Sequence, residues 1–102
     1  MSVLHTVSQS PGMGSALASC IRLSAAGSAI LLTEDAVIAA LAGGAAEDAV
    51  TAVLDTRRVF ALTPDLKARG LEAGRIIDGV ELVDHAGFVD LCTEYSKVLA
   101  WY

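Results

Sequence analysis

Apolar residues along this 102-residue chain fall into two kinds of stretch, short uninterrupted runs and longer segments with helical spacing. The short runs predict strands, since a strand in a sheet covered on both faces needs little polar surface. The longer segments place apolar side chains three and four positions apart, which predicts helices. Strands are expected at residues 3–7, 29–32, 59–62, 80–83 and 98–101, with an apolar pair at 76–77, and helices at residues 15–25, 36–42, 47–54, 65–69 and 84–95.

Glycine and proline mark several boundaries between these elements. Gly27 follows the first helix and suits its C-terminal cap, where left-handed backbone is common. The sequence Thr63-Pro64-Asp65 predicts a helix start, with a capping hydroxyl, proline at the first position and an acid facing the positive helix end. We therefore expect short, well-delimited elements with no linker between them.

The order of these elements indicates an α/β fold. Strands and helices alternate along the whole chain, which is typical of a mostly parallel sheet with right-handed crossovers. We expect a single small domain over residues 1–102, with about five strands and helices on both faces in a three-layer arrangement.

The composition points to a domain with partners. The chain is 54% hydrophobic but only 5% aromatic, so Ala, Val, Leu and Ile must build the core. Mean hydropathy is +0.56, yet no apolar run approaches the roughly 20 residues that a membrane-spanning helix needs. The sheet interior uses part of this apolar excess, and a subunit interface is the expected destination for more.

Charge and cysteine content exclude several classes of function. The net charge is −5 and no Lys/Arg cluster exists, so direct nucleic-acid binding is not expected. Two cysteines without C-x-x-C spacing predict neither a disulfide framework nor a zinc site. The first residues do not resemble a signal peptide, and we expect a cytoplasmic protein with free thiols.

Cys20 is the main candidate for chemistry. With Leu17 at the centre of the apolar face of the first helix, the helical repeat places Cys20 roughly 60° to the side. That position predicts a thiol at the seam between core and solvent, held in place and still reachable. The alternative is an inert buried thiol, because free cysteine commonly behaves as a small core residue.

Five other features offer weaker candidates. The loop at residues 11–14 contains Gly12 and Gly14 where a dinucleotide-binding loop would lie, but the third glycine is replaced by Leu17. The adjacent Glu34 and Asp35 are read as helix-start acids rather than a catalytic pair. The remaining features are His5, expected to be buried and hydrogen-bonded; His85, expected to be exposed; and Cys92, expected in the core.

Several segments together resemble the DsrH/TusB family from one end of the chain to the other. One segment is residues 31–41, similar to the family's LLxxDGVxAAL pattern, with Ala36 where glycine is common. Another is residues 59–71, similar to its VYALxxDLxARGL pattern. The remaining matches are Leu4-His5-Thr6, Ser10-Pro11, Asp84 with Phe88-Val89, and the closing Ala100-Trp101.

The resemblance implies a DsrEFH-like α/β fold and a subunit of a heterohexameric sulfurtransferase. Such complexes pair DsrE/TusD-like, DsrF/TusC-like and DsrH/TusB-like subunits and pass persulfide sulfur to a DsrC/TusE-like acceptor, with no metal or organic cofactor. The principal persulfide cysteine is implied to lie on the DsrE/TusD-type partner. Two branches are implied, one serving intracellular sulfur oxidation and one serving 2-thiolation of the tRNA wobble uridine.

Cys20 bears on the choice between these branches. Members of the sulfur-oxidation branch resemble this chain at Cys20, whereas TusB members generally lack cysteine there. The main expectation is therefore a DsrH-type subunit with Cys20 as an auxiliary persulfide carrier. The alternatives are a TusB-type subunit in tRNA thiolation and a purely structural subunit without its own sulfur transfer. The sequence shows no activating base for Cys20, and Arg22, two residues further on, points away on the helix.

Overall fold

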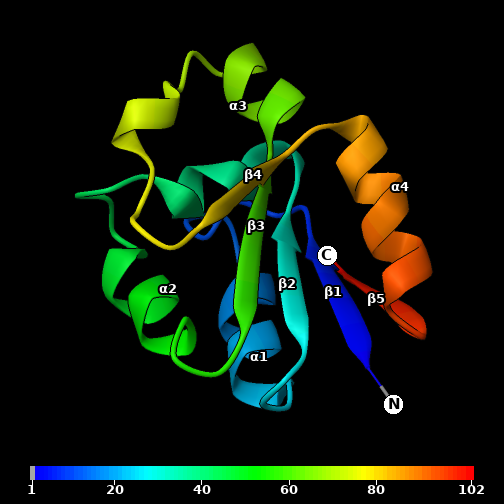
Figure 1. The fold of residues 1–102 in the computed structure, drawn as a ribbon. Coiled ribbons are helices and arrows are strands. Elements are labelled where there is room, and N and C mark those ends of the chain that lie inside the picture. Colours follow the sequence, from blue (N-terminus) through cyan, green and yellow to red (C-terminus); the bar gives the residue numbers. More distant parts are fainter. Residues whose placement is uncertain (1) are drawn as a thin grey trace.

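Five parallel strands form the centre of the molecule (Figure 1). The computed structural model describes residues 2–102. The strands lie in the order β4-β3-β2-β1-β5, so the first strand is next to both the second and the last. Their bounds are β1 Val3–Val7, β2 Ala29–Leu32, β3 Arg58–Leu62, β4 Glu81–Val83 and β5 Lys97–Trp101.

Short helices connect the strands. The α-helices are α1 Ala16–Leu23, α2 Glu47–Val53, α3 Thr63–Ala68 and α4 His85–Glu94, and the 3-10 helices are η1 Glu34–Ala40 and η2 Ala73–Arg75. Within residues 2–102, no helix has the length and apolar character required to cross a bilayer.

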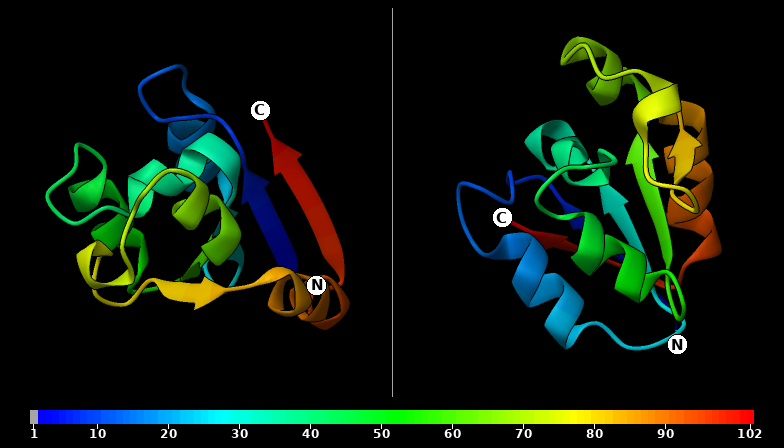
Figure 2. Two further views of the ribbon diagram at one scale, coloured as in Figure 1. Left: turned by 90° about the horizontal axis from the view of Figure 1, so that it is seen from above. Right: turned by 90° about the vertical axis from the view of Figure 1, so that its left-hand side faces the viewer.

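The strand order determines which face each helix covers (Figure 2). From β1 to β4 each new strand is added on the same side, and right-handed crossovers then keep the connecting helices on one face. The chain next passes back beyond β1 to form β5, which puts α4 on the opposite face. The result is the expected α/β domain with a parallel sheet and helices on both faces.

Two buried clusters correspond to the two faces. The larger cluster joins α1, η1, α2 and α3 to side chains such as Val7, Ile30 and Val59. The smaller cluster joins Leu91 of α4 to Leu4 and other side chains of the sheet. Every residue of β2 is buried, because both of its faces are covered.

The boundaries differ from expectation in several places, of which three change an element's type, cap or length most. The segment expected as an α-helix at residues 36–42 is the 3-10 helix η1, which already begins at Glu34. Thr63 is not a capping residue, because α3 begins at Thr63 itself and Leu62 holds the cap position without a side-chain bond. The fourth strand is reduced to Glu81–Val83, while Ile76 forms an isolated antiparallel bridge with Leu41.

Candidate functional site

Cys20 lies inside the larger core cluster and is fully buried. The expectation of a thiol at the edge of the core is therefore wrong. The buried stripe of α1 runs through Leu17, Cys20 and Ser24, whereas Ile21 is only partly buried. Leu17 lies on the buried face as expected, but that face extends to Cys20 instead of ending before it.

Burial also changes the acidity of this thiol. It raises the pKa of Cys20 to about 11, and the positive charge of Arg57 offsets only part of that rise. Thiolate is the form of cysteine that attacks sulfur. In the folded chain Cys20 is therefore both inaccessible and protonated at neutral pH.

The cavity with the most varied chemistry lies elsewhere, at the carboxyl ends of the strands. It has a volume of about 340 Å³ and we call it the carboxyl-edge cavity. In open parallel sheets this edge is the usual place for ligands. Its seven lining residues come from two strands, the loop after β2, and helices η1, α3 and α4: Thr6, Thr33, Glu34, Leu62, Asp65, His85 and Phe88.

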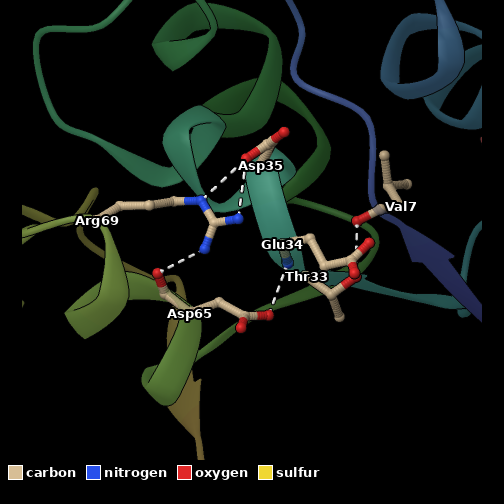
Figure 3. A network of polar contacts seen from close by, with 6 residues as sticks. All are labelled: Val7, Thr33, Glu34, Asp35, Asp65 and Arg69. Atoms are coloured by element: carbon tan, nitrogen blue, oxygen red, sulfur yellow. Dashed lines mark hydrogen bonds and ion pairs between the residues drawn. The ribbon is translucent and has the colours of Figure 1, made fainter.

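A network of polar contacts shapes one wall of this cavity (Figure 3). The backbone N–H of Glu34 donates a hydrogen bond of 2.6 Å to the Asp65 carboxylate. The hydroxyl of Thr33 donates to the carbonyl of Val7 over 3.3 Å. These bonds connect the ends of β1 and β2 to the first turn of α3.

Arg69, at the end of α3, contacts η1 beside the cavity. Its Nη2 lies 2.8 Å from Oδ1 of Asp35, and Nε donates to the same oxygen over 3.1 Å. Its Nη1 donates to the backbone carbonyl of Asp65 over 3.1 Å (Figure 3). The Asp35 carboxylate binds Arg69, whereas the backbone N–H of Glu34 binds Asp65. These neighbouring acids therefore do not form one site.

Glu34 adopts a left-handed backbone with φ of 49°. Residues other than glycine rarely adopt this conformation, and strained positions often occur at functional sites. The strain lets the chain turn directly from β2 into η1, which places Glu34 in the cavity wall.

The cavity combines hydroxyl, carboxylate, imidazole and aromatic groups. His85 is exposed, as expected, and lines the cavity together with Glu34. Thr6 and Asp65 were not predicted as site residues, and Asp65 was expected only as the acid of a helix start. Both lie at the cavity because parallel strands end at one edge of the sheet. No cysteine lines the cavity, so its own side chains suit binding rather than sulfur transfer.

The glycine loop at residues 11–14 does not form an open phosphate site. The side-chain Oε1 of Gln9 accepts a hydrogen bond of 3.2 Å from the backbone N–H of Ala16, at the start of α1. A Cβ atom at Gly14 would overlap the Gln9 side chain. Gln9 thus occupies the helix end at which a phosphate would bind in a dinucleotide site.

Of the other two sequence candidates, His5 lies as expected, whereas Cys92, expected in the core, lies at its edge. His5 is buried, and its Nδ1 accepts a hydrogen bond of 3.0 Å from the indole N–H of Trp101. This bond joins β1 to β5, which contain the first and last segments of the resemblance to the DsrH/TusB family. Cys92 is partly buried and packs against the smaller core cluster.

Taken together, these features define a small α/β domain with an open parallel sheet and a polar cavity at its carboxyl edge. The sequence model described as DsrH like protein matches residues 9–98. The chain belongs to this DsrH-like family.

Similar proteins cover the chain almost completely. "Protein TusB" of Pectobacterium parmentieri is 39% identical over 100 residues, which are 97% of this chain and 100% of that protein. "Protein TusB" of Escherichia coli O81 (strain ED1a) is 35% identical over 99 residues, with the same coverage.

Two solved structures share the fold. The ychN protein of E. coli has a TM-score of 0.79 at 23% identity and covers 98% of this chain and 99% of its own. A protein of unknown function from Methanobacterium thermoautotrophicum has a TM-score of 0.74 at 14% identity, covering 96% of each chain.

Proposed function

We propose that this chain is a TusB-type subunit of a cytoplasmic sulfur-relay complex that supplies sulfur for 2-thiolation of the tRNA wobble uridine. The observation that carries the proposal is identity of 35–39% with proteins named TusB, over their whole length. These relatives favour the tRNA branch over sulfur oxidation, which was the main expectation from the sequence.

The structure supports an assembly role for this chain within such a complex. A persulfide relay needs a thiolate that can attack a terminal sulfur and can leave again. Cys20 is fully buried with a raised pKa, and no cysteine lines the carboxyl-edge cavity. The principal sulfur-carrying cysteine then belongs to a DsrE/TusD-like partner, with a DsrF/TusC-like subunit completing the complex and a DsrC/TusE-like protein accepting the sulfur.

Complementation tests the branch directly. The chain is expressed in bacteria that lack their own TusB-type subunit, and 2-thiouridine in tRNA is measured by mass spectrometry. We expect restored thiolation with the wild type and with Cys20→Ser. Absence of restoration, together with rescue of a sulfur-oxidising host that lacks its DsrH-type subunit, would reassign the chain to the sulfur-oxidation branch.

Persulfide mapping tests whether Cys20 is a carrier. The assembled complex is loaded with a persulfide donor, and each cysteine is examined for one added sulfur by intact-protein and peptide mass spectrometry. We expect the label on the partner and none on Cys20, with Cys92→Ser as the matched control. One added sulfur on Cys20 that is lost in Cys20→Ser would establish the auxiliary carrier role and contradict a purely structural subunit.

A further inference from the structure

A second cavity lies at the opposite end of the sheet from the carboxyl-edge cavity. Its volume is about 320 Å³, and we call it the amino-end pocket. It is bounded by the start of β1 and by the loop between α1 and β2, and its lining residues are Ser2, Val3, His5, Leu23, Ala25, Ala26, Gly27 and Ser28. The lining contains an imidazole and two hydroxyls but no carboxylate.

His5 is the polar group that is built into this pocket. The side chain is almost completely buried, with 6% exposed, and it still lines the cavity. Its Nδ1 lies 3.0 Å from Nε1 of Trp101. An indole N–H is only a donor, so Nδ1 must be the unprotonated acceptor. The proton of the neutral ring is therefore on Nε2, for which residues 2–102 provide no hydrogen-bond acceptor.

A positive charge lies behind the same loop. Arg57 donates from Nη2 to the carbonyl of Ser24 over 2.6 Å and from Nη1 to the hydroxyl of Thr56 over 3.4 Å. Its Nε is buried and has no partner within residues 2–102. The pKa of His5 is lowered, first by burial and then by the charge of Arg57. His5 is thus held neutral, as a fixed donor in a positive local field.

We propose that the amino-end pocket binds a small oxyanion, a carboxylate or phosphate group, through the Nε2–H of His5. Arg57 lies outside the lining and contributes only its positive charge. The Nε2–H of His5 has no acceptor within residues 2–102, which favours a ligand that accepts hydrogen bonds. The cavity volume is at the lower end for ligand sites, so the group is small.

Nuclear magnetic resonance on the full chain tests this site. The ring nitrogens of His5 are observed at pH 7.5 while sodium acetate or inorganic phosphate is added, with sodium chloride at equal ionic strength as reference. We expect a saturable shift of the His5 Nε2 resonance with at least one oxyanion and no saturable shift with chloride. Acetate and phosphate, titrated separately, distinguish a carboxylate ligand from a phosphate ligand.

Ala26 provides a matched pair of variants. It is exposed at the pocket, so substitution there leaves the core intact. Ala26→Glu brings a carboxylate to the pocket and is expected to weaken binding of the added oxyanion at least tenfold, whereas Ala26→Gln is expected to retain it. The proposal is overturned by an unsaturable shift, by an equal response to chloride, or by equal binding to both variants. It does not depend on the sulfur-relay proposal, which is tested in the complex.

Discussion

At the scale of single residues, Cys20 shows how burial overrides residue type. Its pKa is raised to about 11 from a reference of 9.0. Because the thiolate fraction changes tenfold per pKa unit, that rise lowers the reactive fraction about 100-fold at pH 8. We expect iodoacetamide to modify Cys20 at least 100-fold more slowly in the folded chain than in urea, since steric exclusion adds to this factor.

Peptide mass spectrometry over time measures this difference. Cys92 is partly exposed and serves as the internal reference for reagent activity. Equal labelling of Cys20 in the folded and unfolded chain would show that α1 opens readily, and would revive the auxiliary carrier role.

His5 makes stability depend on pH. Burial and the charge of Arg57 lower its pKa in the folded chain, so the unfolded chain binds the proton more readily. The contribution of neutral His5 to the free energy of unfolding is then fully present above the unfolded pKa of about 6.5. It is lost as the pH drops below that value. Protonation of Nδ1 also removes the acceptor for Trp101.

Urea unfolding at pH 7.5, 6.5 and 5.5 measures this dependence. We expect the wild type to lose stability over this interval and His5→Gln to show a smaller loss. The comparison concerns how steeply the free energy of unfolding changes with pH. A destabilisation of the variant that is the same at every pH therefore does not affect it. Identical slopes would show that another group causes the loss.

At the scale of secondary-structure elements, the junction of β2 and η1 depends on Glu34. Its φ of 49° is unfavourable for a side chain with a Cβ atom. We expect Glu34→Gly to raise the free energy of unfolding by about 0.5–1 kcal/mol, because glycine accepts this backbone without strain. Glu34→Ala removes the same carboxylate but keeps the strain, and is the matched control. Urea unfolding measures the free energy of unfolding of both variants. A gain that is as large with alanine as with glycine would assign the effect to loss of the carboxylate charge.

The contact between α3 and η1 depends on Asp65. Its carboxylate accepts the backbone N–H of Glu34 at 2.6 Å. A hydrogen bond to a charged acceptor is worth about 1.5–3 kcal/mol, and partial exposure puts this one toward the lower value. We expect Asp65→Ala to destabilise the chain by about 1–2 kcal/mol in urea unfolding, and Asp65→Asn to lose less, because the amide oxygen still accepts. Equal losses in both variants would show that charge, and not the hydrogen bond, is what matters.

At the scale of the whole molecule, the strands and their order along the chain could be predicted from the sequence, but the cavity at the carboxyl edge could not. Apolar runs locate strands because strands such as β2 are buried on both faces. The meeting of Glu34, Asp65 and His85 at one cavity depends on strand order and on the face that α4 covers, which no local pattern encodes. The burial of Cys20 on α1 likewise depends on tertiary packing.

The apolar excess of the chain gathers partly at an open edge of the sheet. β5 is an edge strand, and its residues 97–100 are all exposed. Val98 and Leu99 are 44% and 40% exposed. An exposed apolar edge strand invites pairing with another chain. In a sulfur-relay complex, the sibling subunits are the partners that would cover it.

Val98→Asp tests this edge against Ile38→Asp, which changes a side chain of similar exposure, 42%, on η1. Because both side chains are exposed, each substitution is expected to change the stability of the isolated chain by only about 0.5 kcal/mol. We expect Val98→Asp to reduce co-purification with the DsrE/TusD-like and DsrF/TusC-like subunits at least tenfold, and Ile38→Asp to leave it unchanged. The opposite result would place the interface on the face covered by η1, and loss in neither variant would leave the β5 edge without a role in assembly.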